Sequence, residues 1–327
     1  MPRKRQPIHF ENAPRTIPPD LPVIVATPTD FLDTFATLAP LPGATATARG
    51  AFLVAPADFS LAAESARDNR YMAMDQVVDP LRALAQHQAL AQALRDDVPV
   101  VVLPGDASTP DAVFPNNVFA TAPDTLIVGR MRHPVRQREA ERADIRDFFG
   151  ELLGYDEIDL SGCDNLVAEL TGSLVIDRAR GIGYCGLSER CDLAGAEAMH
   201  RAFGLRLTYA FELAPGEYHT NVVFALLAGR AAILAADGFA DPAVPQAIAQ
   251  AYGNRALWLS PAQKQAYAAN AITLSDERVW MSAVAAASLT GEQRDALAGW
   301  GFRLDTVDLS EIEKAGGSLR CCVGEIY

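Results

Sequence analysis

The sequence predicts an α/β protein, in which short buried strands alternate with amphipathic helices. Runs of β-branched and other apolar residues recur along the chain, as expected for strands that are buried on both faces. Stretches rich in Ala, Leu, Gln, Glu and Arg lie between several of these runs and favour helix. No glycine-rich phosphate loop follows a strand, which argues against a nucleotide-binding doubly wound sheet.

The expected elements cover most of the chain. Strands are predicted at 23–26, 52–55, 98–103, 125–128, 173–176, 222–227, 231–234, 271–274 and 279–282. Helices are predicted at 76–95, 137–153, 191–203, 243–252 and 291–299. Residues 1–20, rich in Pro, Arg and Lys, are expected to form a flexible arm, and residues 21–327 a single domain.

Composition excludes several classes of protein. The net charge of −13 argues against nucleic-acid binding, which needs clustered Lys and Arg. No apolar run approaches the roughly 20 residues of a membrane-spanning helix, and the basic start lacks the apolar stretch of a signal peptide. Five cysteines, an odd number without framework spacing, suit a reducing compartment, so we expect a cytoplasmic protein.

Cysteine is the first candidate for chemistry. Cys163, Cys185 and Cys191 lie in or beside apolar segments, and buried packing accounts for most cysteines. Cys321 and Cys322 differ, because they follow a Gly-Gly-Ser turn that can bring the backbone close to a site. The preceding Arg320 would favour the thiolate and lower the thiol pKa from about 8.5 toward neutral. No other Cys/His pair has zinc-ligand spacing, so no metal site is predicted.

Three further residues or pairs merit attention. His219 directly precedes an apolar strand, which would hold it rigidly for proton transfer, although a structural cap explains the position equally well. Glu169 is the lone acid of a mostly apolar run, so burial would demand a partner for its charge. Asn116 and Asn117 follow a proline before a strand, where an ordinary turn is the simpler interpretation.

These segments, taken in order, resemble the guanidine-modifying superfamily of arginine deiminases, dimethylarginine dimethylaminohydrolases, amidinotransferases and citrulline-utilising hydrolases. The segment 316–321 (GGSLRC) is similar to the nucleophile motif, and 219–224 (HTNVVF) to the catalytic His-x-Asp/Asn strand. The stretch from Glu169 (ELTGSLV), followed by 186–190 (GLSER), resembles the glutamate segment. Residues 114–117 (FPNN) fall where those enzymes carry a substrate-contacting acid or amide. The resemblance runs from about residue 52 to 327.

The resemblance implies an α/β propeller of five modules, the pentein fold, around a central pocket. It also implies a covalent mechanism without a cofactor, in which a thiolate attacks the substrate carbon and water later releases the product. Cys321 would be the nucleophile and His219 the proton-transfer residue. Glu169 and Asn117 would orient the substrate nitrogens, Asn221 would hold the substrate or His219, and Asn116 and Arg320 are further candidates for substrate binding.

Two amides in this set bear on the substrate. Arginine deiminases place acids at the positions that match Asn117 and Asn221. A desolvated guanidinium without counter-charges is costly, whereas an amide suits a neutral ureido group with its own donors and acceptor. We therefore expect citrulline, cleaved to ornithine, CO2 and ammonia, as the small-molecule substrate. An arginine deiminase or dihydrolase, a dimethylarginine hydrolase, an amidinotransferase and a catalytically silent amino-acid-binding protein remain alternatives, and association into a homo-oligomer is left open.

Overall fold

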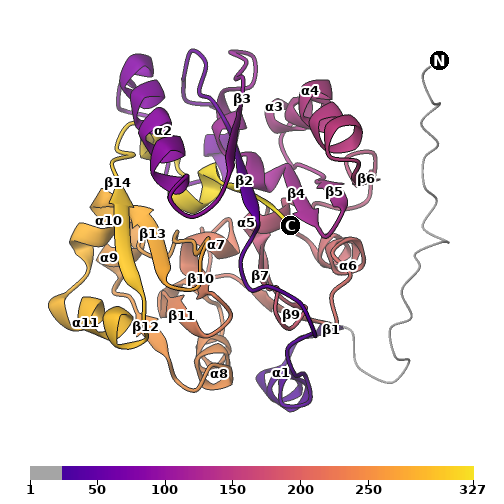
Figure 1. The fold of residues 1–327 in the computed structure, drawn as a ribbon, viewed down its shortest axis with the longest axis vertical. Helices are drawn as coiled ribbons and strands as arrows, with labels where there is room; N and C mark the ends of the chain where they lie inside the picture. Colours follow the sequence, from indigo (N-terminus) through magenta and orange to yellow (C-terminus); the bar gives the residue numbers. More distant parts are fainter. Residues whose placement is uncertain (1–23) are drawn as a thin grey trace.

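Five small sheets surround the centre of the molecule (Figure 1), and four of them share one pattern of three strands. The computed structural model describes residues 24–327, so the arm expected at 1–20 lies outside the described residues. The sheets are β15–β2–β3 (Gly324–Ile326, Gly50–Val54, Val100–Leu103), β4–β5–β6 (Phe119–Ala122, Thr125–Val128, Asp156–Asp159), β7–β8–β9 (Leu174–Asp177, Ile182–Leu187, Leu207–Glu212) with β1 (Ile24–Val25) at its edge, β10–β11–β12 (Phe224–Leu227, Ala231–Leu234, Ala256–Trp258) and β13–β14 (Arg278–Ser282, Arg303–Val307).

The repeated pattern is an antiparallel pair followed by a parallel strand. In four sheets the first strand runs antiparallel to the second, and the second runs parallel to the third. In the fifth sheet the first strand is reduced to one antiparallel bridge between Ile272 and Trp280. The strand expected at 271–274 is therefore wrong, because the chain bends away after this single pair. The five-module propeller itself is confirmed.

Helices cover the outside of the ring and connect the second strand of a sheet to the third (Figure 1). They are α2 (Pro80–Leu94), α3 (Pro134–Gln137), α4 (Ala143–Asp147), α6 (Leu193–Ala202), α8 (Ala243–Ala251), α10 (Ala283–Ser288) and α11 (Gly291–Gly299), while α1 (Pro28–Phe35) and α9 (Pro261–Gln265) lie in other connections. Side-chain caps start several of them: Asp79 accepts from two N–H groups of α2, and Thr290 forms a capping box with Gln293.

The continuous helix expected at 137–153 is wrong. That stretch consists of the 3₁₀ turn η4 (Arg138–Glu141), α4 and the π-helical turn η5 (Phe148–Leu152). Arg142 interrupts it in an extended conformation, with φ −61° and ψ 99°. Its guanidinium bonds both Asp144 and the carbonyl oxygen of Pro104, and these contacts stabilise the break.

Short helical turns at the inner end of four sheets position the candidate residues. They are η3 (Pro115–Asn117), α5 (Leu170–Ser173), α7 (Thr220–Val223) and η8 (Leu319–Cys322), and each one leads into the first strand of a sheet. The remaining 3₁₀ turns are η1 (Ser65–Arg67), η2 (Pro110–Val113), η6 (Ala236–Gly238) and η7 (Ile312–Ala315). Because the sheets are arranged around one centre, segments far apart in sequence meet there.

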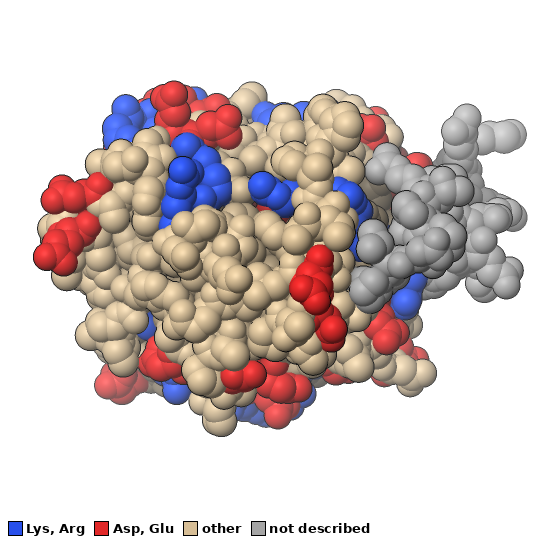
Figure 2. Space-filling model, turned by 90° about the horizontal axis from the view of Figure 1, so that it is seen from below, with Lys and Arg blue, Asp and Glu red and all other residues tan. Residues whose placement is uncertain are grey.

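The surface and the core differ in composition as expected for a water-exposed fold. Aromatic residues such as Phe31, Tyr184 and Tyr209 are fully buried between the sheets and outer helices. Figure 2 shows one face of the molecule with acidic side chains mostly near its margin and basic ones mostly in its upper part, without a broad basic surface. Within residues 24–327 no helix combines the length and apolar character needed to cross a membrane.

Candidate active site

Cys321 lies at the centre of the ring, on η8, and is 2% exposed. Asn270 donates a hydrogen bond from Nδ2 to its sulfur at 3.3 Å and accepts the Cys321 N–H through Oδ1, also at 3.3 Å. Burial raises the pKa of the thiol, although the Asn270 hydrogen bond and the charge of Arg320 lower it in part. The expectation that Arg320 brings this pKa down toward neutral is therefore wrong, because desolvation outweighs that charge.

His219 faces the same cavity as Cys321 and is paired with Glu169. Its Nε2 lies 2.8 Å from Oε2 of Glu169, and both side chains are almost completely buried. An ionised carboxylate only accepts hydrogen bonds, so the proton of the neutral ring stands on Nε2 and Nδ1 carries the lone pair. Nδ1 is buried and has no hydrogen-bond partner within residues 24–327. The ring therefore presents a proton acceptor to the cavity.

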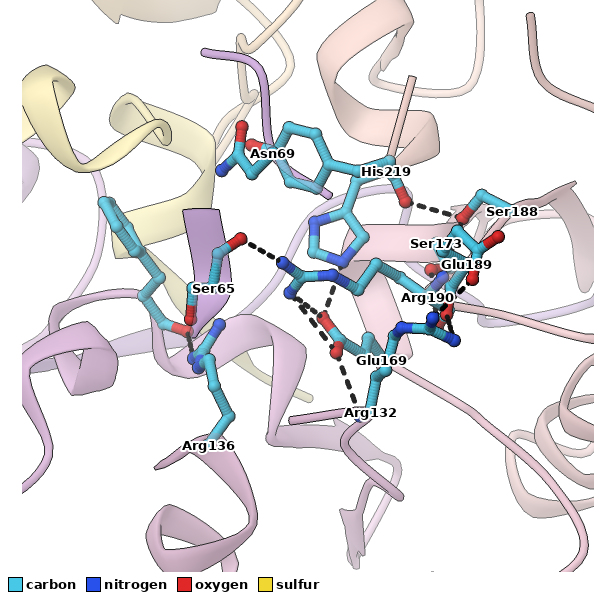
Figure 3. Close-up of polar contacts among 12 residues, drawn as sticks. Ser65, Asn69, Arg132, Arg136, Glu169, Ser173, Ser188, Glu189, Arg190 and His219 are labelled. Carbon is cyan, nitrogen blue, oxygen red and sulfur yellow. Dashed lines mark hydrogen bonds and ion pairs between the residues drawn. The ribbon is translucent and has the colours of Figure 1, made fainter. Parts of the chain in front are cut away.

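Glu169 is held in its ionised form by the residues around it (Figure 3). Arg190 donates to both carboxylate oxygens at 3.4 and 3.2 Å, and the N–H of Arg132 donates to Oε1 at 3.2 Å. Burial alone would raise the pKa of Glu169, but the Arg190 charge and the His219 hydrogen bond outweigh it and hold the pKa well below its usual range. Burial also lowers the pKa of His219, and Glu169 counters this only in part, so the imidazole is neutral at pH 7.

Glu169 contacts His219 from outside the cavity. It does not line the cavity that Cys321 and His219 share, and its oxygens are occupied by Arg190, Arg132 and His219. This position corrects the expectation that Glu169 orients the substrate nitrogens directly. The arrangement instead makes it an orienting partner of the histidine.

Asn117 and His219 approach each other across Gly172. A Cβ placed on Gly172 would stand 2.5 Å from Oδ1 of Asn117 and 2.9 Å from Nδ1 of His219, which no side chain tolerates. Oδ1 of Asn117 is buried without a hydrogen-bond partner, as is Nδ1 of His219. Glycine is thus required in α5, because it lets Asn117 and His219 approach each other closely beside the cavity that both line.

A second set of cavity-lining residues is charged. Asp111, Arg136 and Arg190 line the same space as Cys321 and His219. Oδ2 of Asp111 accepts from the Ser65 hydroxyl, whereas Oδ1 is buried and unpartnered. Burial raises the pKa of Asp111, against the lowering effect of the Arg136 charge.

The two arginines of this set are fixed by carboxylates. Nε and Nη2 of Arg136 bind the two oxygens of Glu139, each at 2.8 Å. Arg190 binds Glu169 through Nη1 and the carbonyl oxygen of Ser65 through Nη2 at 2.9 Å (Figure 3). Its Nε also binds Asp68 at 2.8 Å. Bidentate and multiple charge-assisted bonds of this kind fix the orientation of each guanidinium.

The segment 65–72 closes over one side of the cavity. Ser65 and Asn69 line it, and Nδ2 of Asn69 donates to the carbonyl oxygen of Gly316 at 3.2 Å. Gly316 has φ +80°, and a Cβ there would stand 2.4 Å from Nδ2 of Asn69. Farther along, Tyr71 donates to the buried Glu217 at 2.7 Å, and Arg70 forms an ion pair with the same carboxylate. The Gly-Gly turn thus provides close approach for this segment, as the sequence suggested.

Three predicted binding residues do not line the cavity shared by Cys321 and His219. The guanidinium of Arg320 binds Glu325 at 2.8 Å and the carbonyl oxygen of Val323 at 2.9 Å, and it lines a separate polar cavity with Asn221. Asn221 lies beside Cys321, with Oδ1 3.8 Å from the sulfur, and donates to the carbonyl oxygen of Thr171. Asn116 is buried with both amide atoms unpartnered and lines neither cavity. We therefore leave Arg320 and Asn116 out of the proposed substrate contacts.

Several site residues were missed by sequence reasoning. Asp111 lies three residues before the segment 114–117, and Arg190 ends the segment 186–190, so both were near recognised motifs without a role of their own. Arg136 lies in a polar stretch, and Asn270 in an apolar one, with no local signal in either case. Within residues 24–327 no group of three or more His, Cys, Asp or Glu side chains could hold a metal ion.

Comparisons with known proteins place this geometry in a family. The family model described as "N,N dimethylarginine dimethylhydrolase, eukaryotic" matches residues 55–327. The uncharacterized protein YkgA of Bacillus subtilis (strain 168) is 27% identical over 241 residues, which cover 72% of this chain and 77% of YkgA.

Solved structures share the fold at low identity. The substrate-bound N-terminal domain of ArgZ, an arginine dihydrolase from cyanobacteria, superposes with a TM-score of 0.73 at 19% identity, covering 85% of this chain and 97% of that domain. The chain spans 40% of the ArgZ chain in its apo structure. A dimethylarginine dimethylaminohydrolase in an adduct with S-methyl-L-thiocitrulline gives a TM-score of 0.66 at 22% identity, covering 85% of this chain and 100% of that one.

The family match extends over most of the chain, and the superposed structures have the same five-module architecture. The superfamily inferred from the motifs is therefore confirmed, whereas the citrulline-utilising branch within it stays a prediction. The chain belongs to the N,N-dimethylarginine dimethylhydrolase family, in the guanidine-modifying superfamily of pentein-fold proteins.

Proposed function

We propose that this protein is a cysteine-dependent hydrolase that cleaves a C–N bond in the ureido or guanidino group of an amino acid, with citrulline as the favoured substrate. Relatives of known activity support the reaction type, since they are hydrolases of arginine and its derivatives by name. The choice of citrulline depends on the residues of this chain.

The two unpartnered atoms across Gly172 are the observation that carries the proposal. Asn117 and His219 both line the cavity that contains Cys321, and Oδ1 of the one and Nδ1 of the other can each accept one N–H from a planar terminal group held in that cavity. Neither side chain supplies a counter-charge for a cation, because asparagine is not ionisable and the lowered pKa of His219 leaves its imidazole neutral. A neutral ureido group satisfies both acceptors without needing a counter-charge, whereas a guanidinium would be desolvated here without one.

The charged residues suit the other end of an amino acid. Arg136 and Arg190 offer guanidinium groups for an α-carboxylate, and the unpartnered Oδ1 of Asp111 offers an acceptor for an α-ammonium. Citrulline has this pair of charges at one end and a neutral group at the other. Its charge distribution is thus complementary to the two sets of lining residues.

The reaction would proceed in two halves: the thiol first displaces ammonia, and water then hydrolyses the resulting thiocarbamate. The Cys321 thiol loses its proton to Nδ1 of His219, the sulfur bonds to the ureido carbon, and the terminal C–N bond breaks as His219 returns the proton to the departing ammonia. Water then gives a proton to His219 and attacks the same carbon, which breaks the C–S bond. The resulting N-carboxylated ornithine loses CO2 to leave ornithine, so citrulline and one water yield ornithine, CO2 and ammonia.

One observation favours arginine as a second candidate. The unpartnered carboxylate oxygen of Asp111 is the one group among the cavity-lining residues that could balance a guanidinium. An arginine dihydrolase would use the same sulfur and imidazole twice, first producing citrulline and then cleaving it. In that case Asp111 would face the guanidino end of the substrate.

Product analysis distinguishes these candidates. Purified protein is incubated separately with citrulline, arginine and dimethylarginine, and ornithine, citrulline and ammonia are followed by mass spectrometry, with a Cys321→Ser variant as the control. We expect ornithine from citrulline and no consumption of arginine. Ornithine or citrulline from arginine would overturn the substrate choice, and transfer to an added amine would indicate an amidinotransferase. Binding without turnover of all three would contradict the hydrolase.

A further inference from the structure

Asn270 contacts the proposed nucleophile Cys321, although it lies outside the four motifs recognised in the sequence. Asn270 follows a turn at Tyr267, whose φ is +61°, and the N–H of Asn270 donates to the Tyr267 carbonyl oxygen at 2.8 Å. This turn stands at the inner end of the β13–β14 sheet, directly before the bridge residue Ile272. Asn270 itself is completely buried.

We propose that Asn270 is a positioning residue for the nucleophile: its side-chain amide fixes Cys321 at both the backbone and the sulfur, and its Nδ2 stabilises the thiolate. The inference rests on the proposed role of Cys321 and adds the group that orients and activates it.

The contacts of Asn270 determine which way its amide points. Oδ1 accepts the N–H of Cys321 at 3.3 Å, while Nδ2 donates to the sulfur at 3.3 Å and to the carbonyl oxygen of Asn221 at 2.9 Å. The carbonyl oxygen of Asn270 also accepts the N–H of Arg320 at 3.4 Å. A flipped amide would place Nδ2 against the Cys321 N–H and Oδ1 against the Asn221 carbonyl, so the donor must face the sulfur.

The two amides beside the sulfur act in opposite directions. Asn270 donates to the sulfur and so favours the thiolate, whereas Oδ1 of Asn221, 3.8 Å away, can only accept a proton from the thiol and so favours the neutral form. Arg320, next in sequence, directs its guanidinium to Glu325 instead. Asn270 is therefore the side-chain donor to the sulfur among the described residues, and its hydrogen bond lowers the pKa of the Cys321 thiol together with a backbone hydrogen bond from Ser318.

The neighbouring cysteine shows what this contact provides. Cys322 follows Cys321 directly and is equally buried, but no hydrogen bond to its sulfur is made within the described residues. Burial raises the pKa of the Cys322 thiol well above its usual range. For Cys321 burial also raises the pKa, but the Asn270 hydrogen bond opposes that rise. The amide thus distinguishes the reactive thiol from an inert neighbour.

Alkylation by iodoacetamide across a pH series tests the proposal without any substrate, with Cys321 followed by site-resolved mass spectrometry. Asn270→Ala removes the donor, and we expect the thiol pKa to rise by about 1, with alkylation at pH 7 slowed about tenfold. Asn270→Asp keeps the shape and the acceptor for the Cys321 N–H but replaces the donor with a charged oxygen, so its effect should be larger. Raising the pH should restore the rate of the Ala variant.

A purely structural role predicts a different result. Loss of packing would change the alkylation rate by the same factor at every pH, with no shift of its midpoint, and that outcome would overturn the proposal. Asn165→Ala, at an exposed position, is the matched control and should behave as the wild type. Because the assay needs no turnover, failure of the citrulline hypothesis leaves this test intact, and the two hypotheses fail separately.

A second measurement keeps Asn270 intact, so it remains possible if the Asn270 variants do not fold. The side-chain amide protons of Asn270 are followed by NMR while the wild type and Cys321→Ser are titrated with base. A shift that follows thiol ionisation in the wild type and is missing in Cys321→Ser would support the contact. Amide resonances that do not respond to ionisation would contradict it.

Discussion

The cavity beside Cys321 has two sets of polar groups that differ in how they are satisfied. The charged set, Arg136 and Arg190, is bonded to Glu139, Asp68 and Glu169, and these bonds fix each guanidinium. In the neutral set, Oδ1 of Asn117 and Nδ1 of His219 have no partner, although both are buried. Buried polar atoms are nearly always hydrogen-bonded, so an exception needs an explanation.

This difference suggests that the charged set binds the substrate and that the neutral set contacts the atoms that react. Groups that are already fixed lose little freedom on meeting a ligand and suit recognition of an invariant part of the substrate. Groups that lack a partner gain one only when substrate arrives, which suits the atoms that react. Asp111 combines both features, since one oxygen accepts from Ser65 and the other is unpartnered.

The largest expected effect comes from the nucleophile. Cys321→Ser should lower kcat by at least ~10³, because a serine hydroxyl beside a neutral imidazole is a far weaker nucleophile than a thiolate. Cys322→Ser, one residue away, should retain most of the activity. Steady-state kinetics and a thermal unfolding curve for both variants check this, and equal losses in the two would refute the assignment.

Next comes the proton-transfer residue. His219→Ala should lower kcat at least ~10²-fold, because it removes the imidazole nitrogen that takes the thiol proton and returns it to the leaving ammonia. Glu169→Gln should affect activity less directly, by losing the carboxylate that orients the ring and by leaving Arg190 without one of its partners. Steady-state kinetics of both variants at several pH values measure these losses. A loss of only a few-fold for His219→Ala would exclude its proposed role in proton transfer.

Replacing Asp111 tests whether this carboxylate binds the α-ammonium group or the reacting group of the substrate. Asp111→Asn should raise the KM for citrulline about tenfold or more with a smaller change in kcat, because a charged hydrogen bond to the α-ammonium is weakened. Asp33→Asn, at an exposed position, is the control. If kcat fell while KM stayed the same, Asp111 would act at the reacting group, which would favour the arginine alternative.

Asn117 tests the charge of the neutral set. Asn117→Asp places a carboxylate opposite His219 and should change the ratio of kcat/KM for arginine over citrulline by about tenfold in favour of arginine. Asn221→Asp serves as the comparison, since Asn221 lies beside the sulfur and lines the other cavity. An unchanged ratio for Asn117→Asp would mean that the amide is not what selects the substrate.

The smallest effect concerns the spacing of the neutral set. Gly172→Ala would put a methyl group 2.5 Å from Oδ1 of Asn117 and 2.8 Å from Cε1 of His219, so we expect a loss of about 1–3 kcal/mol in stability together with lower kcat. A Cβ on Gly162 would meet nothing within 4 Å, so Gly162→Ala is the matched control. Denaturant unfolding measures the difference, and wild-type stability for Gly172→Ala would contradict the packing argument.

Sequence reasoning located the residues that lie inside short motifs. Cys321, His219, Glu169 and Asn117 all come together at the centre, because each motif leads into the first strand of a module and the modules share one axis. The strands themselves were harder to predict. Strand β14, for example, is Arg303–Val307, in which three of the five residues are polar, so it contains no apolar run.

What sequence could not provide is the pairing between modules. Asn270 and Cys321 are 51 residues apart, and Glu169 and His219 are 50 apart, so only the closed ring brings them into contact. The direction of Arg320 could not be predicted either, because Glu325 competes for its guanidinium. Adjacent position in the chain suggested an electrostatic role that the folded side chain does not adopt.

The most direct test of the account is to trap the covalent intermediate. The protein is mixed with citrulline or arginine, quenched in acid within the first turnover, and analysed by intact and peptide mass spectrometry. The account predicts an adduct on Cys321 from citrulline, equal in mass to the substrate without ammonia, and none from arginine. An adduct from arginine alone, or one on any other cysteine, would contradict it.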